Sequence, residues 1–277
     1  MNLVVASPTG LCFGVRRAIE RLEGALSEYG IVHSLGSPIH NPQEVARLEG
    51  SGLELIEKAA DMPEGGVSFV RAHGVARSEL EELTRRSRLV IDGTCPHVST
   101  AQARAESLSK EGYRVVVVGD SNHPEVRGIL GYIEGESLVI SGESEIDEET
   151  RCGRLGVLSQ TTQKESSFAA AVSRLALRAG EIKVYNTICG ATIERQKSIQ
   201  RLAAQVDGIV VIGGRNSANT RKLVEIAESL GVPAMWIEHS GELSRRWLQG
   251  KRSIGVAAGG STPDWLIKDL KCKLQTL

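Results

Sequence analysis

The sequence predicts an α/β fold made of three similar domains with mostly parallel sheets. Two observations carry this prediction. Short β-branched runs alternate with helix-like stretches along the 277 residues, a pattern typical of parallel sheets covered by helices. Three cysteines, Cys12, Cys95 and Cys189, also occur in the same local context. We therefore expect three domains, at residues 1–95, 96–188 and 189–277.

Each repeat begins with a predicted strand, at residues 3–5, 89–91 and 182–184, which precedes the cysteine. A helix-like stretch follows each cysteine and begins near Arg16, Ser99 and Thr192. A cysteine between a strand and a helix lies where the positive end of the helix stabilises a thiolate. The three cysteines are therefore candidates for metal ligands.

The second element of each repeat is a strand that ends at a glycine 24 residues after the cysteine: Gly36, Gly119 and Gly213. A polar loop containing Asn follows each glycine, at residues 36–41, 119–125 and 213–219, and leads into a helix. Ligands of parallel sheets bind outside the carboxyl ends of the strands, where these loops are expected.

The third element is a strand with a small polar loop, at residues 67–74, 155–162 and 253–262. These loops carry His73, Thr161 and Ser261, which lie 61, 66 and 72 residues after their cysteines. If the loops of all three repeats share one centre, cysteines, histidines and hydroxyls meet in one pocket. The alternative is an old gene triplication without a shared site.

Composition excludes several classes of protein. Lys and Arg total 33 against 34 Asp and Glu, so the basic surface typical of nucleic-acid binding is absent from the chain as a whole. No apolar run approaches the ~20 residues of a membrane span, and the N-terminus does not resemble a signal peptide. We expect a cytoplasmic protein with no nucleic-acid or membrane partner. The five separated cysteines indicate no disulfide framework, and Cys152 and Cys272, outside the repeat, are interpreted as small buried side chains.

Three thiolates could bind zinc or an iron–sulfur cluster, and composition does not separate the two metals. Structural zinc sites use closely spaced cysteine pairs, whereas these cysteines are 83 and 94 residues apart. A cubane cluster with three thiolates keeps one iron open to act as a Lewis acid.

The remaining loops carry neutral or cationic donors suited to an anion such as a diphosphate. The donors are His40, His73, His123, Ser217, Asn219 and Ser261. Neither a Walker A sequence nor a dinucleotide fingerprint is present. Glu125 follows His123-Pro124 and is either a partner of the helix dipole or a general acid.

Nine motifs in series carry a resemblance to a known family. They are Thr-Gly-Leu-Cys at 9–12, Ile-His-Asn-Pro at 39–42, Ala-His-Gly-Val at 72–75, Thr-Cys-Pro at 94–96, His-Pro-Glu-Val at 123–126, Gln-Thr-Thr at 160–162, Ile-Cys-Gly-Ala-Thr at 188–192, Asn-Ser-Ala-Asn-Thr at 216–220 and Gly-Ser-Thr-Pro at 260–263. The sequence resembles the 4-hydroxy-3-methylbut-2-enyl diphosphate reductases of the methylerythritol phosphate route to isoprenoids. It departs from residues common in the family at Leu11, Gly93, Gln102, Ala218 and Gly260.

The resemblance implies a pseudo-threefold cloverleaf around a central [4Fe–4S] cluster, one per chain, with Cys12, Cys95 and Cys189 as ligands and one open iron. It also implies a diphosphate site made of His40, His73, His123, Ser217, Asn219 and Ser261. Thr161 would hold the substrate hydroxyl, and Glu125, assisted by His123, would supply the proton.

The implied reaction is the two-electron reductive dehydroxylation of (E)-4-hydroxy-3-methylbut-2-enyl diphosphate to isopentenyl and dimethylallyl diphosphate plus water. The electrons would come from a ferredoxin or a flavodoxin. The alternatives are a non-catalytic iron–sulfur redox sensor on the same scaffold, a reductase of another allylic diphosphate, and a zinc hydrolase.

Overall fold

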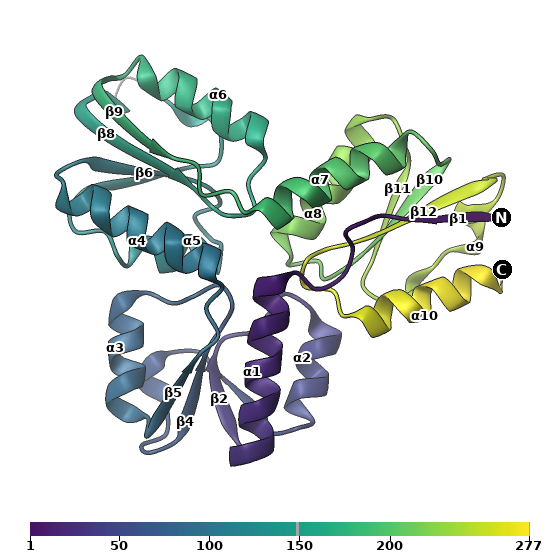
Figure 1. Cartoon of the computed structure of the whole chain (residues 1–277), viewed down its shortest axis with the longest axis horizontal. Coiled ribbons are helices and arrows are strands. Elements are labelled where there is room, and N and C mark those ends of the chain that lie inside the picture. The colour runs from purple at the N-terminus through teal and green to yellow at the C-terminus, as the bar shows by residue number, and fades with distance from the viewer. Residues whose placement is uncertain (148–149, 277) are drawn as a thin grey trace. The chain divides into compact units, whose positions relative to one another are not determined.

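The computed structural model describes residues 1–147 and 150–276 and contains, within them, three sheets of four parallel strands each (Figure 1). Sheet A has the order β1 (Asn2–Val5), β12 (Ser253–Ala258), β10 (Gly208–Ile212) and β11 (Ala234–Ile237). Sheet B has the order β3 (Leu53–Ile56), β2 (Val32–Leu35), β4 (Val67–Val70) and β5 (Leu89–Asp92). Sheet C has the order β7 (Ser137–Ile140), β6 (Arg114–Val118), β8 (Cys152–Ser159) and β9 (Ala179–Tyr185). The predicted α/β class with parallel sheets is confirmed.

Helices alternate with these strands. The α-helices are α1 (Phe13–Tyr29), α2 (Pro42–Glu49), α3 (Arg77–Arg86), α4 (Pro96–Lys110), α5 (Pro124–Leu130), α6 (Glu165–Ala176), α7 (Gly190–Ala203), α8 (Ala218–Ser229), α9 (Arg245–Leu248) and α10 (Asp264–Gln275). Short 3-10 helices lie at η1 (Ala59–Asp61), η2 (Glu143–Glu145) and η4 (Ser240–Glu242). None of the helices in the described residues is long and apolar enough to span a membrane.

The chain divides into two compact units. Unit 1 contains Met1–Arg16, Ile39–Arg47 and Gly190–Leu277, and therefore sheet A. Unit 2 contains Arg17–Pro38 and Leu48–Cys189, and therefore sheets B and C.

The core of unit 1 follows the alternation of side chains along β10. Ile209 and Val211 pack with residues of α7 and α8 on one face of sheet A. Val210 and Ile212 pack with residues of α9 and α10 on the other face. Because successive strand residues point to opposite faces, an uninterrupted apolar strand is buried by helices on both sides, as Figure 1 shows.

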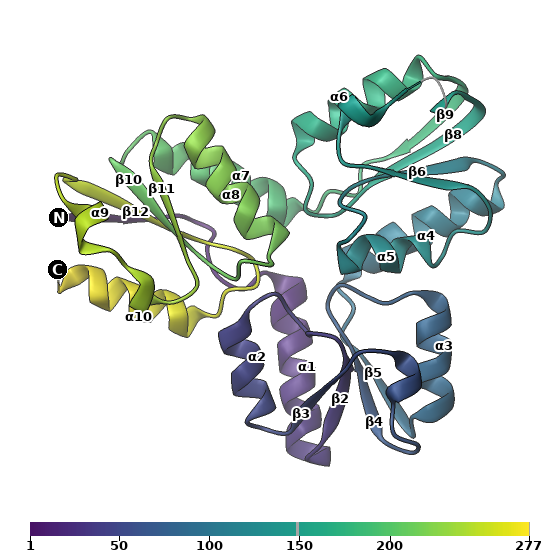
Figure 2. The same cartoon turned by 180° about the vertical axis from the view of Figure 1, so that it is seen from behind.

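Unit 2 repeats this arrangement. In sheet C, Val115 and Val117 of β6 pack with residues of α4 and α5, and α6 lies on the opposite face of the sheet (Figure 1). Sheet B lies with α1 and α3 beside it, as Figure 2 shows from behind.

The helices that follow the cysteines begin earlier than the sequence predicts. They start at Phe13, Pro96 and Gly190, one residue after each cysteine. The carbonyls of Cys12 and Cys95 accept the first helical hydrogen bonds, from Arg16 and Ser99, at 2.9 and 3.0 Å. Each cysteine therefore lies at the N-terminus of its helix, where the helix dipole favours negative charge.

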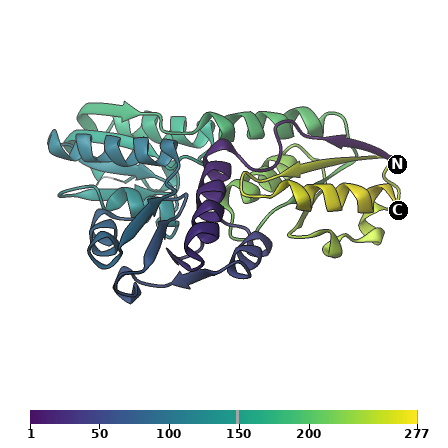
Figure 3. The ribbon, with the colours of Figure 1, turned by 60° about the horizontal axis from the view of Figure 1, so that its bottom comes forward.

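The pairing of strand β1 departs from the prediction that residues 1–95 form one domain. Strand β1 pairs with β12, which lies near the other end of the chain, in sheet A. Each of the other sheets likewise includes the strand that precedes the next cysteine, β5 in sheet B and β9 in sheet C. The strand before Cys12 is the first of the chain and completes the last sheet. Figure 3 shows the result, with β1 alongside β12 and both chain ends at the same side of unit 1.

Candidate functional site

The most closely bonded pair of candidate residues is Glu125 and Thr161 in unit 2. Glu125 lies in the first turn of α5, and Thr161 follows β8. The Thr161 backbone N–H donates to Glu125 Oε1 at 2.6 Å, and the Thr161 hydroxyl donates to Oε2 at 2.9 Å. Glu125 is 2% exposed and Thr161 5%. One residue therefore holds both oxygens of a buried carboxyl group in a fixed orientation.

His123 adjoins this pair as the N-cap of α5. Its Nδ1 accepts a hydrogen bond from the Glu125 backbone N–H at 3.1 Å, which leaves Nε2 to carry the proton of the neutral ring. The ring of His73 lies edge-on to that of His123, with 5.6 Å between ring centroids. Unit 2 thus brings His73, His123, Glu125 and Thr161 together.

The two cysteines of unit 2 are tied to the same loops through their backbones. The Cys95 N–H donates to the carbonyl of Ala72, the residue before His73, at 3.0 Å. The Cys189 N–H donates to the carbonyl of Thr161 itself at 3.0 Å. A displacement of either cysteine loop would therefore move a candidate binding or catalytic residue.

Gly93, a departure noted in the sequence, is required by the packing before Cys95. A Cβ atom at this position would lie 2.3 Å from the Phe69 ring and 2.6 Å from the Val70 carbonyl oxygen. The buried ring of Phe69 occupies the space that an alanine side chain would need.

Cys12 belongs to unit 1, where it lies beside the loop that carries Ser261. Its N–H donates to the Gly260 carbonyl at 2.9 Å. A Cβ atom at Gly260 would be 3.5 Å from Cys12 Sγ and 3.6 Å from Asn219 Nδ2. The thiol and the Asn219 amide therefore flank the same glycine, and alanine would fit there without a clash.

The remaining candidates of unit 1 are Ser217, Ser261 and His40. Ser217 is the N-cap of α8, and its hydroxyl accepts a hydrogen bond from the Thr220 N–H at 3.2 Å. The Ser261 hydroxyl donates to the His40 carbonyl at 3.1 Å. These contacts bring the His40 backbone and Ser261 together within unit 1.

Several polar atoms of unit 1 are buried without a hydrogen bond in the described part of the chain: Asn41 Nδ2, Asn219 Oδ1 and Thr220 Oγ1. Buried polar atoms in proteins are almost always bonded to protein, water or ligand. The atoms around the His40 and Ser217 loops therefore suit a polar ligand.

The cysteines fit a thiolate-bound metal group. Cys12, Cys95 and Cys189 are half-buried, each at the start of a helix. Soft thiolate donors that are far apart in the sequence suit an iron–sulfur cluster.

The two cysteines outside the repeat differ in exposure. Cys152 is half-buried, whereas Cys272 is exposed on α10, so the interpretation of Cys272 as a buried side chain is wrong. It lies on the solvent face of α10, away from Leu270 and Leu274, which are buried.

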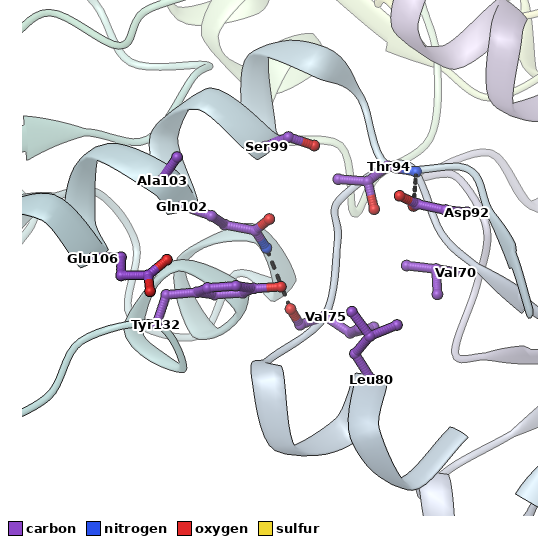
Figure 4. Close-up of a pocket in the computed structure, with 10 residues that line it drawn as sticks. All are labelled: Val70, Val75, Leu80, Asp92, Thr94, Ser99, Gln102, Ala103, Glu106 and Tyr132. Atoms are coloured by element: carbon purple, nitrogen blue, oxygen red, sulfur yellow. Dashed lines mark hydrogen bonds between the residues drawn. The ribbon is translucent and has the colours of Figure 1, made fainter. Parts of the chain in front are cut away.

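A cavity of about 210 Å³ lies next to the Cys95 loop in unit 2 (Figure 4). Asp92 and Thr94 line it on one side, and Gln102, Glu106 and Tyr132 on the other. Asp92 Oδ1 accepts a hydrogen bond from the Thr94 N–H at 2.8 Å, and Gln102 Nε2 donates to the Val75 carbonyl at 3.2 Å. Gln102 thereby links α4 to the segment that follows His73.

Sequence reasoning missed two arginines that hold the cysteine loops. Arg195 of α7, 4% exposed, donates from Nη2 to the Gly10 carbonyl at 2.6 Å, two residues before Cys12. Arg17 of α1 donates to the Thr94 carbonyl at 3.0 Å, one residue before Cys95. Arg17 lies five residues after Cys12, and Arg195 lies six residues after Cys189. These spacings are the only sign in the sequence that the two arginines support the cysteine loops.

Comparisons with known proteins point to one family. A family model described as "LytB protein" matches residues 3–275. A 4-hydroxy-3-methylbut-2-enyl diphosphate reductase of Aquifex aeolicus (strain VF5) is 41% identical over 281 residues, covering 100% of this chain and 97% of the relative. One from Geobacter sulfurreducens (strain ATCC 51573 / DSM 12127 / PCA) is 43% identical over 275 residues, covering 99% and 97%.

Two solved structures are also similar. One is described as the structure of (E)-4-hydroxy-3-methyl-but-2-enyl diphosphate reductase, the terminal enzyme of the non-mevalonate pathway; it matches with a TM-score of 0.73 and 41% identity, covering 100% of both chains. The E-1-hydroxy-2-methyl-but-2-enyl-4-diphosphate reductase of Plasmodium falciparum matches with a TM-score of 0.90 and 26% identity, covering 100% of this chain and 87% of the other.

Proposed function

The chain belongs to the LytB protein family, and from this premise we propose that it reduces (E)-4-hydroxy-3-methylbut-2-enyl diphosphate to isopentenyl and dimethylallyl diphosphate. The reaction consumes two electrons and two protons and releases water. It is the terminal step of the non-mevalonate route to isoprenoids. The observation that carries the proposal is the buried carboxyl group of Glu125, held by Thr161, whose carbonyl in turn holds Cys189.

We propose that Cys12, Cys95 and Cys189 hold one [4Fe–4S] cluster. The support is the thiol chemistry of these side chains, their places at helix N-termini and the family. When bound, such a cluster supplies single electrons and an open iron that acts as a Lewis acid.

The substrate diphosphate is assigned to the histidine and hydroxyl donors of the loops: His40, His73, His123, Ser217, Asn219 and Ser261. His123 has its Nδ1 engaged by the α5 backbone, so Nε2–H is the donor available to a phosphate oxygen. In unit 1, Asn219 keeps a buried side-chain oxygen without a partner among the described residues. Binding the diphosphate would fix the allylic hydroxyl for reaction, which converts binding energy into orientation.

Glu125 is assigned the role of proton donor to the departing hydroxyl, so that the C–O bond breaks and water leaves. The carboxyl group must carry a proton when it donates to the departing hydroxyl. Thr161 would position this carboxyl and contact the substrate hydroxyl. The geometry suits general acid catalysis because the acid cannot rotate away from Thr161.

Two further parts of the proposal concern the surroundings of the enzyme. Electrons arriving one at a time require a one-electron carrier, and we assign this role to a ferredoxin or a flavodoxin. We assign the protein to the cytoplasm, where cysteine thiols remain reduced.

Anaerobic purification tests the proposal. Iron content, visible absorption and turnover of the hydroxylated allylic diphosphate with dithionite and methyl viologen are measured on the same sample. We expect about four iron atoms per chain, as a [4Fe–4S] cluster requires, together with formation of both products. Zinc in place of iron would contradict the assignment of a [4Fe–4S] cluster. An intact cluster without turnover would favour the alternative of a non-catalytic redox sensor.

A further inference from the structure

A second cavity in unit 2 has no part in the proposed chemistry. It measures about 230 Å³ and lies between the start of α4 and the segment before Cys189. Its walls are His97, Thr100 and Arg104 of α4 together with residues 185–188. Helix α4 begins one residue after Cys95, and Ile188 immediately precedes Cys189. The cavity therefore adjoins two of the proposed cluster ligands, and its α4 wall is exposed.

Unpaired positive charge lies at this cavity. The Arg104 guanidinium stacks on the Tyr185 ring, with 4.6 Å between its carbon and the ring centroid. Within the part of the chain that the structure describes, Arg104 has no carboxylate partner. The positive end of α4 adds to the local potential. An anionic surface is therefore favoured opposite Arg104.

A second cation lies over the same ring. Lys183 Nζ is 5.6 Å from the Tyr185 centroid and forms an ion pair with Glu111 at 2.6 Å. The hydrogen bond to Glu111 raises the pKa of Lys183, so the ammonium group stays charged. Tyr185 thus has two cations against its ring, only one of them neutralised by a carboxylate.

The cavity in Figure 4 provides a contrast. Its Glu106 is bonded to both Arg77 and Lys110, at 2.8 and 2.5 Å. Asp92 caps the Thr94 N–H. The charge of Glu106 is therefore neutralised within the protein, and this residue does not require a charged partner.

We propose that the surface formed by His97, Thr100, Arg104, Lys183 and Tyr185, named here the α4–β9 surface, is the docking site of an acidic one-electron carrier protein. The inference rests on the proposed function, which needs two electrons per turnover. In each encounter the carrier loses one electron and this protein gains one, and no atom is transferred. Arg and Tyr are the side chains that most often dominate protein interfaces, and opposite charge accelerates and orients encounter.

The test compares two electron sources. A purified acidic flavodoxin, reduced to its hydroquinone, is one donor, and dithionite with methyl viologen is the other. The variant is Arg104→Glu. The matched control is Arg174→Glu, which makes the same charge change at an exposed position on α6 of the same unit.

For Arg104→Glu we expect kcat/KM for the flavodoxin to fall about tenfold at low ionic strength, with viologen-driven turnover unchanged. Arg104→Lys should retain most of the flavodoxin-driven rate. High salt should bring the Arg104→Glu and wild-type rates together, because screening weakens exposed charge pairs. Arg174→Glu should behave as wild type with both donors.

Calorimetric binding of oxidised flavodoxin gives a readout that needs no turnover. We expect Arg104→Glu to weaken binding about tenfold and Arg174→Glu to leave it unchanged. Equal binding and equal flavodoxin-driven rates in the two variants would overturn the α4–β9 surface while leaving the enzyme assignment intact. If the wild-type protein shows no turnover with the viologen donor, the proposed function is overturned instead.

Discussion

At the scale of single residues, chemistry depends on how firmly a reactive group is held. Glu125 accepts hydrogen bonds from both the backbone and the hydroxyl of Thr161, and its own N–H is bonded to His123. The contacts from Thr161 link the loop that follows β8 to the first turn of α5, whereas the His123 contact lies within the start of α5. The orientation of the acid is therefore a property of the sheet edge in unit 2 rather than of one flexible loop.

For Glu125→Gln we expect turnover to fall by roughly 10²–10⁴-fold, the usual contribution of a general acid. The amide can keep a hydrogen bond to Thr161 but cannot donate a proton to a leaving hydroxyl. Iron content and visible absorption should stay at wild-type values, which separates lost chemistry from lost structure. Turnover close to the wild-type rate would remove Glu125 from its assigned role.

The cysteines give a prediction with internal controls. Cys95→Ser should lose most of its iron, because a hydroxyl is a poor soft ligand and two thiolates do not hold a cubane cluster well. Cys152→Ser and Cys272→Ser should retain full iron content, since neither residue lies at the start of a helix that follows a strand end. The test is the iron content of the three variants after anaerobic purification. A stable Cys95→Ser protein with the full iron content would contradict the assignment of Cys95 as a cluster ligand.

The sequence spacing could predict these residues but not the ones that support them. Cys12, Cys95 and Cys189 stand out because the 24-residue interval to the following glycine is the same in each repeat. Arg195 reaches the Gly10 carbonyl across 185 positions of the chain, and no local pattern encodes such a contact. Long-range hydrogen bonds of this kind depend on how the folded sheet brings distant residues together, so the sequence alone does not predict them.

At the scale of elements, the missed features are short edge strands. Strands β3, β7 and β11 have four residues each and lie at sheet edges. Only one partner strand stabilises such an element, and its outer residues stay half-exposed, so the apolar run is weak. Strands β1 and β5 are equally short edge strands, and they could be predicted because a cysteine follows each of them. The central strands β6 and β10, buried along almost their whole length, could be predicted with ease.

Helix α3 provides a prediction on acid stability. Hydrogen bonds from Arg85 and Arg86 hold the pKa of Glu82 at about 2, below its usual 4.5. A carboxyl with a lowered folded-state pKa stabilises the protein above its unfolded pKa and loses that contribution as the pH falls. The effect of Glu82 should therefore be complete at neutral pH and disappear between pH 4.5 and about 2.

In urea unfolding, Glu82→Gln should be less stable than wild type at pH 7, and the difference should shrink as the pH approaches 3. The difference should be small and should fall with added salt, because the ion pairs lie at the surface. Glu79→Gln, on the same helix but bonded to the Ala76 N–H, is the matched comparison. A difference for Glu82→Gln that grows towards acid pH would contradict the sign of the pKa shift.

At the scale of the whole chain, the repeat is cyclic. Sheets B and C each recruit the strand that leads to the next cysteine, and sheet A recruits β1 from the other end of the sequence. The register pairs Val5 with Val256, so the first residues close a sheet whose other strands begin at Gly208. Domain boundaries drawn by sequence position could not anticipate this, because pairing depends on an open sheet edge and not on proximity along the chain.

Deleting residues 1–5 should therefore damage the far end of the chain. Leu3 and Val5 pack against the cluster that contains α10 residues, and Val4 packs against the cluster of α7 and α8. Loss of three partly buried aliphatic side chains should lower the free energy of unfolding by about 3 kcal/mol, measured with urea. Hydrogen exchange should report faster opening of β12, the strand left at the edge, while the amides of β6 in sheet C keep their protection. Unchanged protection of β12 would mean that β1 contributes nothing to sheet A.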